Sequence, residues 1–255
     1  MTWLFLKLSL VAASILGATL AARRWGHAVS GLMAGLPLII GPITAILLID
    51  QPAERVRAIA LATLQCQPAM LLHVVVFAHA ARRWSWPACL LLANAAYLAA
   101  AALLTALALE PLAATALTIA AWLMAGRALP RGGGGPQGPV AVPPSELWWR
   151  LGIALVVAGG VIQGAASLPA AIGGVLLALP ITGNVLPAFT LPRHGPQATA
   201  RLLGGFVRGQ LGFAAFVMAI VGLLPWLPPA PAFAAAVVAA TALPWLLGRY
   251  RGLRP

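Results

Sequence analysis

The sequence predicts an all-α integral membrane protein of about nine transmembrane helices, built from two inverted-topology repeats whose second and seventh helices are broken. Three observations lead to this prediction. Apolar runs of about twenty residues recur along the chain, and that length crosses a bilayer as a helix. Hydrophobic residues form 62% of the 255 positions and charged residues only 8%, too few to cover a soluble domain. Finally, the second half of the chain resembles the first after a shift of 143 positions.

The first predicted helix is apolar, and we expect it to be a retained span. A signal peptide carries its positive charge before the apolar run, whereas here Lys7 lies inside the run and Arg23 and Arg24 follow it. Eight further apolar runs follow, separated by short turns rich in proline, glycine or charge. The nine predicted spans are Trp3–Ala22, His27–Ile49, Ala53–Ala80, Trp86–Leu109, Pro111–Leu129, Glu146–Ala166, Leu168–Leu191, Gln197–Leu224 and Ala230–Leu247.

The segment "PRGGGGPQGPVAVPPSE" separates the fifth and sixth predicted spans. It is too rich in glycine and proline for a helix and too polar for lipid, so residues 130–145 are predicted to be a flexible cytoplasmic linker. Its glycines lack the Lys-Ser/Thr ending of a phosphate-binding loop. The linker divides the chain into residues 1–129, a first repeat with an extra span, and residues 146–255, a second repeat of four spans.

The basic residues predict the orientation in the membrane. The net charge is +12, but the arginines form short clusters between apolar runs, as the positive-inside rule expects, so we expect no nucleic-acid partner. In the nine-span scheme twelve basic residues fall on one face and three, Lys7, Arg55 and Arg57, on the other. The amino terminus is therefore predicted outside and the carboxy terminus in the cytoplasm, with the bacterial inner membrane as the location.

The internal repeat is clearest around two interruptions. "AVSGLMAGLPLI" from Ala28 matches "AIGGVLLALPIT" from Ala171, so that Leu36-Pro37 falls on Leu179-Pro180. Five spans separate equivalent helices, and an odd number inserts the second copy upside down. Inverted repeats of this kind place discontinuous helices, with a substrate site, near the middle of the bilayer.

Proline removes a backbone donor and clashes with the preceding turn, so "GLPLIIGP" and "LPITGNVLP" are predicted to break the second and seventh spans. Freed carbonyl groups persist in a membrane only against protein or water, and half-helix ends suit a polar guest. The alternative is that these prolines and glycines only kink the helices and let them pack closely.

Polar side chains inside the spans extend the candidate site. Arg208 lies about 16 Å along its helix and Asn184 about 12 Å from the same face, at 1.5 Å per residue. Arg208 either meets an anionic ligand in a cavity or extends to the cytoplasmic surface. The predicted substrate-binding residues are Gly35, Pro37, Gly41, Pro42, Gln65, Gln67, Pro180, Gly183, Asn184, Pro187, Arg208 and Gln210.

Ion coupling and cofactors have little support in the sequence. The four acidic residues lie at span ends, so no buried carboxylate is expected to carry a proton or sodium ion, and we expect no metal and no cofactor. His73 is the one deep side chain that titrates near neutral pH, and Asp50 ends the second span; these two are the candidates for proton coupling. Cys66 and Cys89 have no metal-binding spacing and are expected to pack within helices.

The pattern Gly-x5-Pro inside a span occurs at Gly31 to Pro37 and again at Gly174 to Pro180, each time before an apolar run. In this the chain resembles the small four-span bacterial inner-membrane proteins of the GlpM type, and larger uncharacterised bacterial membrane proteins that carry two such units. The fifth span and the linker depart from the smaller proteins, as an inverted fusion requires. The resemblance implies this architecture and no particular substrate.

Two functions remain open from the sequence. The first is a secondary transporter that moves a small anionic or amphipathic solute by alternating access. The second is a lipid-handling protein, such as a polyprenyl-phosphate flippase or an accessory subunit of polysaccharide export, in which Arg208 meets phosphate. An enzyme is not expected, since the sequence contains no HExxH, no G-x-S-x-G and no cluster of acids. The bilayer is the expected partner, and assembly into a homo-oligomer is compatible with the sequence.

Overall fold

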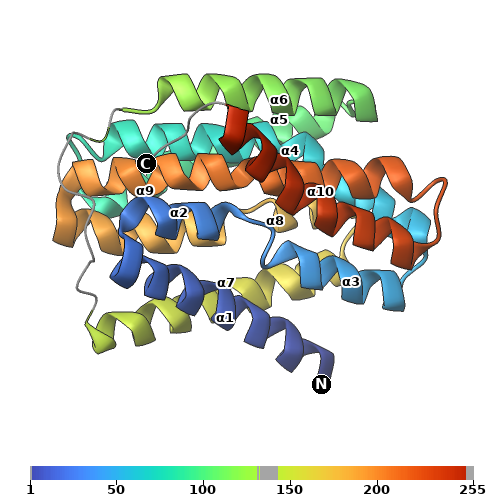
Figure 1. The fold of residues 1–255 in the computed structure, drawn as a ribbon, viewed down its shortest axis with the longest axis horizontal. Coiled ribbons are helices and arrows are strands. Elements are labelled where there is room, and N and C mark those ends of the chain that lie inside the picture. The colour runs from blue at the N-terminus through green and yellow to red at the C-terminus, as the bar shows by residue number, and fades with distance from the viewer. Residues whose placement is uncertain (1, 131, 133–142, 251–255) are drawn as a thin grey trace.

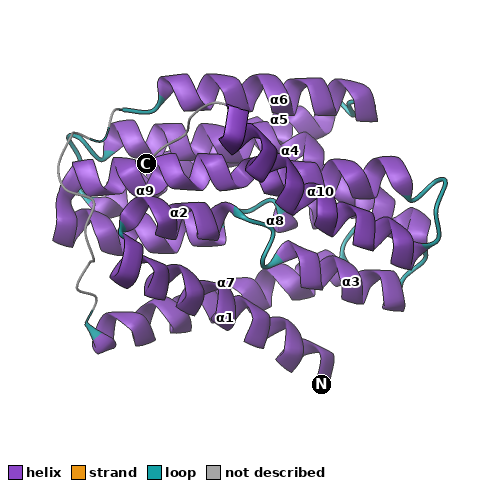
Figure 2. Cartoon of the chain, in the orientation of Figure 1, coloured by secondary structure: helices purple, strands orange, loops and turns teal. Residues whose placement is uncertain are grey.

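The computed structural model describes residues 2–130, 132 and 143–250, and every regular element among them is a helix (Figure 2). Most of the predicted linker, residues 130–145, lies outside the described residues. Most of the helices run along the longest axis of the molecule (Figure 1). They are α1 Thr2–Trp25, α2 His27–Gly35, α3 Ile40–Asp50, α4 Ala53–Ala80, α5 Trp86–Ala106, α6 Pro111–Ala128, α7 Pro144–Ser167, α8 Ala170–Leu177, α9 Ile181–Leu223 and α10 Pro229–Tyr250.

Five segments of the described chain are long and apolar enough to cross a membrane: His27–Asp50, Ala53–Ala80, Trp86–Ala106, Pro111–Ala128 and Ala170–Leu223. The outer helices expose large apolar side chains, among them Leu91, Leu112 and Met124, which suits contact with lipid. These features are those of a helical membrane protein. The count of nine spans stays a prediction.

Helix α9 is formed by two arms. Gly195 has φ of 76°, a conformation that side-chain-bearing residues rarely adopt, and Pro196 follows it. The chain turns back on itself here (Figure 1), so α9 consists of a first arm, residues 181–194, and a second arm, residues 196–223. The turn explains how a segment of 54 residues, about 80 Å if it were one straight helix, fits within the molecule.

Two short breaks divide other helices. Between α2 and α3, Leu36 is extended (φ −69°, ψ 159°), which is the conformation that a following proline, here Pro37, imposes. Between α8 and α9, Pro180 lies at the start of the first arm with ψ of 69°. Both breaks lie near the middle of the long axis (Figure 1), at the sites where the sequence predicts them.

The helix boundaries in the second half repeat those of the first. Helix α4 covers residues 53–80 and the second arm of α9 covers residues 196–223, a shift of 143 positions at both ends. Helix α5 begins at Trp86 and α10 at Pro229, again 143 positions apart. Helix α6 has no counterpart in the second half.

Two helix pairs, α2 with the second arm of α9 and α8 with α4, pack closely through glycine. Helix α2 lies on the second arm of α9, where an added Cβ at Gly31 would collide with the Leu202 carbonyl group. Helix α8 lies on α4, where an added Cβ at Gly174, the counterpart of Gly31, would collide with Ala62. Small residues let both helix pairs approach closely.

The core is centred on α4 and the second arm of α9. These two helices contact each other and supply most of the large side chains that are fully buried, including Leu64, Phe77, Leu203 and Phe216. One helix joins each break to a central helix: α3 leads from the first break to α4, and the first arm of α9 leads from the second break to the second arm.

Candidate functional site

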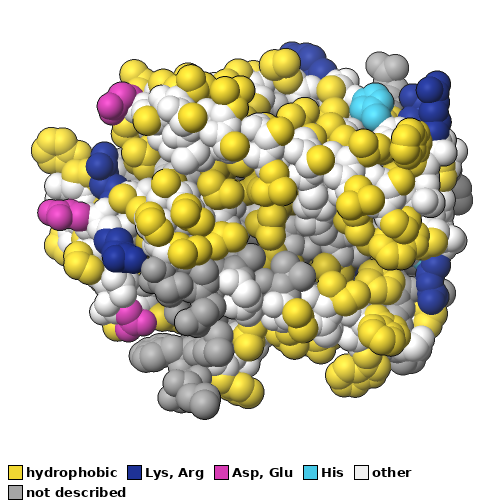
Figure 3. Space-filling view, turned by 180° about the vertical axis from the view of Figure 1, so that it is seen from behind, with side chains coloured by type: hydrophobic (Ala, Val, Ile, Leu, Met, Phe, Trp, Pro, Cys, Tyr) yellow, Lys and Arg dark blue, Asp and Glu magenta, His cyan; other side chains and the backbone are white. Residues whose placement is uncertain are grey.

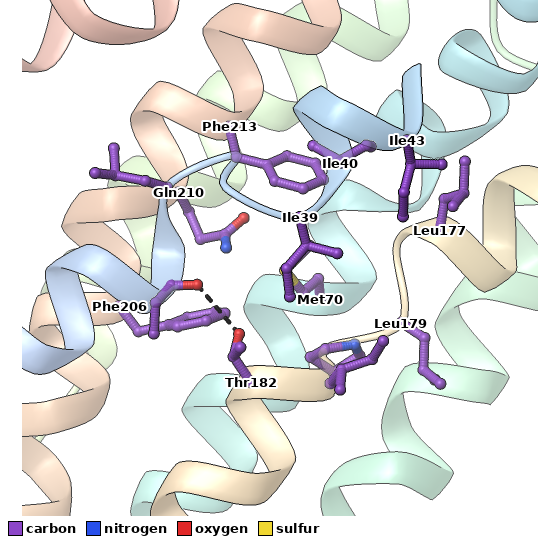
Figure 4. Close-up of a pocket in the computed structure, with 14 residues that line it drawn as sticks. Ile39, Ile40, Ile43, Met70, Leu177, Leu179, Thr182, Phe206, Gln210 and Phe213 are labelled. Carbon is purple, nitrogen blue, oxygen red and sulfur yellow. Dashed lines mark hydrogen bonds between the residues drawn. The ribbon is translucent and has the colours of Figure 1, made fainter. Parts of the chain in front are cut away.

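The two breaks meet at one small cavity of about 50 Å³ (Figure 4). Leu36 and Ile39 line it from the break between α2 and α3, and Leu179 and Pro180 line it from the break between α8 and α9. Leu36 and Leu179 are 143 positions apart, the spacing of the predicted repeat. A water molecule takes up about 30 Å³ of liquid, so this cavity is too small for an organic solute.

Side chains from the second half bind the carbonyl groups that the first break leaves without helical partners. Gln210 donates its Nε2 hydrogen to the oxygen of Gly35 at 3.2 Å. Thr182 donates its hydroxyl to the oxygen of Ala34 at 3.1 Å, the dashed line in Figure 4. The end of α2 is therefore satisfied by protein, as the bilayer interior requires.

A pair of glutamines joins the two halves beside this cavity. Gln67 of α4 donates from Nε2 to Oε1 of Gln210 at 2.7 Å, and both side chains are almost fully buried, with exposed fractions of 1% and 2%. The two residues are 143 positions apart, which is the spacing of the predicted repeat. Among the described residues, Oε1 of Gln67 has no hydrogen-bond partner.

Asn184 belongs to a second polar group, on the first arm of α9. It forms two reciprocal amide bonds with Asn94 of α5, at 2.9 Å and 3.1 Å. Its Oδ1 also lies 2.9 Å from Nε2 of His73, which is fully buried on α4. Because an amide oxygen only accepts, Nε2 of His73 carries the hydrogen. The Nδ1 atom of His73 has no partner among the described residues.

A larger cavity of about 430 Å³ adjoins this second group. Asn94 and Asn184 are its polar lining residues, and the remaining surface is apolar. Trp86 and Ile153, each 43% exposed, lie on its border, which makes the cavity reachable from the outer surface of the helices. Its volume lies in the range of about 300 to 1,000 Å³ that is usual for small-molecule sites. Its lining residues are Trp86, Leu90, Asn94, Ile153, Ile181, Asn184, Val185, Ala188, Phe189 and Pro192.

The structure brings half of the predicted site residues to one of these two places. Gly35, Pro37, Gln67, Pro180 and Gln210 lie at the junction of the breaks, with Pro37 inside the first break. Asn184 and His73 form the second group. The predicted glycines and prolines that follow each break lie within α3 or the first arm of α9: Gly41, Pro42, Gly183 and Pro187.

Three further predicted residues also lie outside both groups. Gln65 is buried, but its amide donates to the oxygen of Leu109, after the end of α5. Arg208 is exposed on the second arm of α9, and Asp50 is exposed at the end of α3. The single polar centre expected from the sequence is thus divided, and Arg208 does not join it.

Asn94 and Thr182, which are not among the predicted site residues, are central to these groups. Asn94 lies deep in an otherwise apolar run, and polar residues at such depth are usually functional or bonded to a neighbouring helix, so its position was a usable signal. Thr182 had no such signal, because threonine occurs throughout membrane helices. Among the described residues, no group of three or more His, Cys, Asp or Glu side chains is arranged to hold a metal ion.

No protein-family model matches the chain, and no similar protein was found among curated proteins or solved structures. The resemblance to GlpM-type proteins therefore stays a prediction.

Proposed function

We propose that this chain is a secondary transporter built from two inverted repeats, and that it moves a small anionic or amphipathic solute by alternating access. In this proposal α1 to α5 correspond to α7 to α10, with the two arms of α9 taking the places of α3 and α4. There are then two discontinuous spans. One consists of α2 and α3, and the other consists of α8 and the first arm of α9. Nine crossings result, with the amino terminus outside.

One observation carries the proposal: the two breaks, which are 143 positions apart in the chain, line the same cavity. Beside that cavity, Gln67 and Gln210, which are also 143 positions apart, form a hydrogen bond. Contact between equivalent residues is what a two-fold pseudo-symmetry axis produces. Transporters with inverted repeats bind their substrates at such a repeat interface.

The present conformation fits a closed state of that cycle. The junction holds space for a water molecule and not for a solute, and the carbonyl groups of Ala34 and Gly35 are bound by protein. Movement of one repeat against the other would separate Gln67 from Gln210 and expose these groups. The larger cavity beside Asn184 has the size of a small solute in this state.

Alternating access can be tested without knowing the substrate. Leu36→Cys and Leu179→Cys, one on each break, are introduced singly after Cys66 and Cys89, both buried, have been replaced by alanine. Each position is then reacted with a membrane-impermeant maleimide in spheroplasts and in inverted vesicles. We expect slow labelling of both positions from both sides. Labelling from one side only, or from neither, would contradict alternating access.

The predicted binding residues are tested once a substrate is known. Asn184→Ala should reduce transport, because it removes the polar lining shared with Asn94. Arg208→Ala tests the sequence-based prediction that Arg208 binds the substrate. Because Arg208 is exposed in the structure, we expect transport to persist in this variant.

A lipid-handling protein is the second candidate, and the border of the larger cavity favours it. Trp86 and Ile153 expose large apolar surfaces there, so an acyl or polyprenyl chain could enter sideways. Reconstitution with fluorescent phospholipid separates the two functions. A lipid handler accelerates the movement of lipid between leaflets, whereas a solute carrier leaves it unchanged.

A further inference from the structure

Asn94 and Asn184 present a fixed pattern of hydrogen-bonding atoms at the larger cavity. The Nδ2 group of Asn94 donates to the backbone oxygen of Leu90 at 2.8 Å and to Oδ1 of Asn184 at 2.9 Å. Because a carbonyl oxygen only accepts, the bond to Leu90 identifies this atom of Asn94 as its nitrogen. The reciprocal bond runs from Nδ2 of Asn184 to Oδ1 of Asn94 at 3.1 Å. The backbone of α5 therefore fixes the orientation of both amides.

One side of this amide pair is fully used. Both Nδ2 hydrogens of Asn94 are donated, and Oδ1 of Asn184 accepts from Asn94 and from Nε2 of His73. An amide nitrogen donates two hydrogen bonds and an amide oxygen accepts two. No capacity therefore remains on the side of the pair that is bonded to His73 and Leu90.

The other side of the pair has one donor and one acceptor left over. Among the described residues, Nδ2 of Asn184 donates one of its two hydrogens, and Oδ1 of Asn94 accepts one hydrogen bond out of two. These two atoms are 3.1 Å apart, and both residues line the cavity. A single group that accepts from Asn184 and donates to Asn94 therefore satisfies both atoms at once.

The cavity selects against a charged guest. None of its described lining residues is charged, and Arg150, whose guanidinium carbon lies 5.4 Å from the centre of the Phe189 ring, is not among them. An anion donates no hydrogen bond and would leave the acceptor of Asn94 unmatched, whereas a cation would leave the donor of Asn184 unmatched. An uncompensated charge is also costly in apolar surroundings. A hydroxyl group or a carboxamide is neutral, and each both donates and accepts.

The border of the cavity favours entry from the bilayer. Trp86 on α5 and Ile153 on α7 lie at this border, and both large apolar side chains are exposed. Figure 3 shows a face of the molecule whose middle is covered by apolar side chains, with charged side chains near its edges, as expected of a surface in contact with lipid. An uncharged amphiphile dissolves in lipid and can reach an apolar border from there.

We propose that the larger cavity is a site for an uncharged amphiphile with a hydroxyl or carboxamide head. The head bridges Nδ2 of Asn184 and Oδ1 of Asn94, and the apolar body lies against Ile181, Val185 and Phe189. This inference rests on the proposed function for the transport step, and it narrows the substrate to an uncharged class.

The test is photolabelling of the purified protein, in nanodiscs of phosphatidylcholine, by a ten-carbon alcohol that carries a diazirine. Mass spectrometry maps the labelled residues, and decan-1-ol, decane and decyl sulfate compete as unlabelled probes, each at a known concentration in the lipid. We expect saturable labelling of residues that line the cavity. Decan-1-ol should displace the label at a concentration about tenfold or more below that of decane or decyl sulfate, the size expected for two neutral hydrogen bonds.

Two variants assign this preference to the amide pair. Asn94→Leu removes the acceptor and should reduce the preference for decan-1-ol over decane to about twofold or less. Thr105→Val is the matched control on the same helix, because the Thr105 hydroxyl donates to the Ala101 oxygen of its own helix and Thr105 does not line the cavity. The control should keep the preference of the wild-type protein.

Three results would overturn the proposal. They are equal displacement by decan-1-ol and decane, equal displacement by decan-1-ol and decyl sulfate, and a preference that survives in Asn94→Leu. The first two comparisons use the wild-type protein, so they decide the question even if Asn94→Leu does not fold.

These outcomes are independent of the maleimide experiment. A preference for decan-1-ol that depends on Asn94, with maleimide labelling from one side only, would retain the site and reject alternating access. Absence of that preference, with maleimide labelling from both sides, would reject this class of substrate and retain the transporter.

Discussion

Asn184 illustrates how one side chain can hold three helices together in a membrane protein. It bonds Asn94 on α5 and His73 on α4 from its own place on α9. In hydrocarbon no water is present to form hydrogen bonds with these groups. Each bond therefore satisfies a polar atom that would otherwise lie unpaired in apolar surroundings.

Replacing Asn184 by leucine, which is of similar size, should destabilise the protein by about 1 to 3 kcal/mol. The substitution leaves Nε2 of the fully buried His73 without an acceptor. The matched variant Asn94→Leu should cost less, because the bond between His73 and Asn184 persists. Unfolding in detergent, followed by circular dichroism, measures both. An equal loss in the two variants would contradict the arrangement described for His73.

Individual side chains were the least predictable part of the site. The sequence drew attention to Arg208 because of its depth along the helix, but its direction depends on how the second arm of α9 packs, which depth alone does not fix. Arg150 lies near the start of the sixth predicted span, where the positive-inside rule alone explains a basic residue. Its burial against Phe189 depends on α9, a helix more than thirty residues away in the chain.

At the scale of helices, close packing of α2 on the second arm of α9 is controlled by glycine. An added Cβ at Gly205 would collide with the carbonyl oxygen of Ala28, and one at Gly209 would collide with that of Leu32. The adjacent Gly204 has no atom within 4 Å of such a Cβ.

Gly205→Ala should therefore destabilise the protein by about 1 to 3 kcal/mol, the usual cost of overpacking. Gly204→Ala, one position away, should be neutral or should stabilise by up to about 1 kcal/mol, because alanine favours the helix over glycine. Thermal unfolding of the two variants in the same detergent provides the comparison. Equal effects would show that α2 and α9 are not in close contact.

Breaks and turns could be predicted from the sequence where a backbone rule applies. Pro37 and Pro180 each end a helical segment by removing a donor, and the structure has breaks at both. The partners of the freed carbonyl groups could not be predicted, since Thr182 and Gln210 reach Ala34 and Gly35 from about 150 to 175 positions away. Such contacts follow from tertiary packing alone.

At the scale of the whole molecule, one spacing found in the sequence recurs in the arrangement of the helices. The helical fold and its membrane character follow from composition and from the length of the apolar runs. The 143-residue spacing in the sequence recurs in the boundaries of α4, α5, α10 and the second arm of α9. Helix α6, which has no counterpart, packs on both α4 and α9, and Trp122 on it donates to the oxygen of Val207 at 2.7 Å.

The central claim is that the two halves are copies inserted in opposite directions. Equivalent residues must then face opposite sides of the membrane. Glu54 and Gln197 form a suitable pair: they are 143 positions apart, each is the second residue of its helical segment, and both are exposed.

The direct measurement is cysteine labelling of two variants, Glu54→Cys and Gln197→Cys, each made in the protein without Cys66 and Cys89. A membrane-impermeant maleimide is added either to intact spheroplasts or to inverted vesicles. The inverted-repeat account predicts that Glu54→Cys reacts only in spheroplasts and Gln197→Cys only in inverted vesicles. Reaction of both positions from the same side would contradict it.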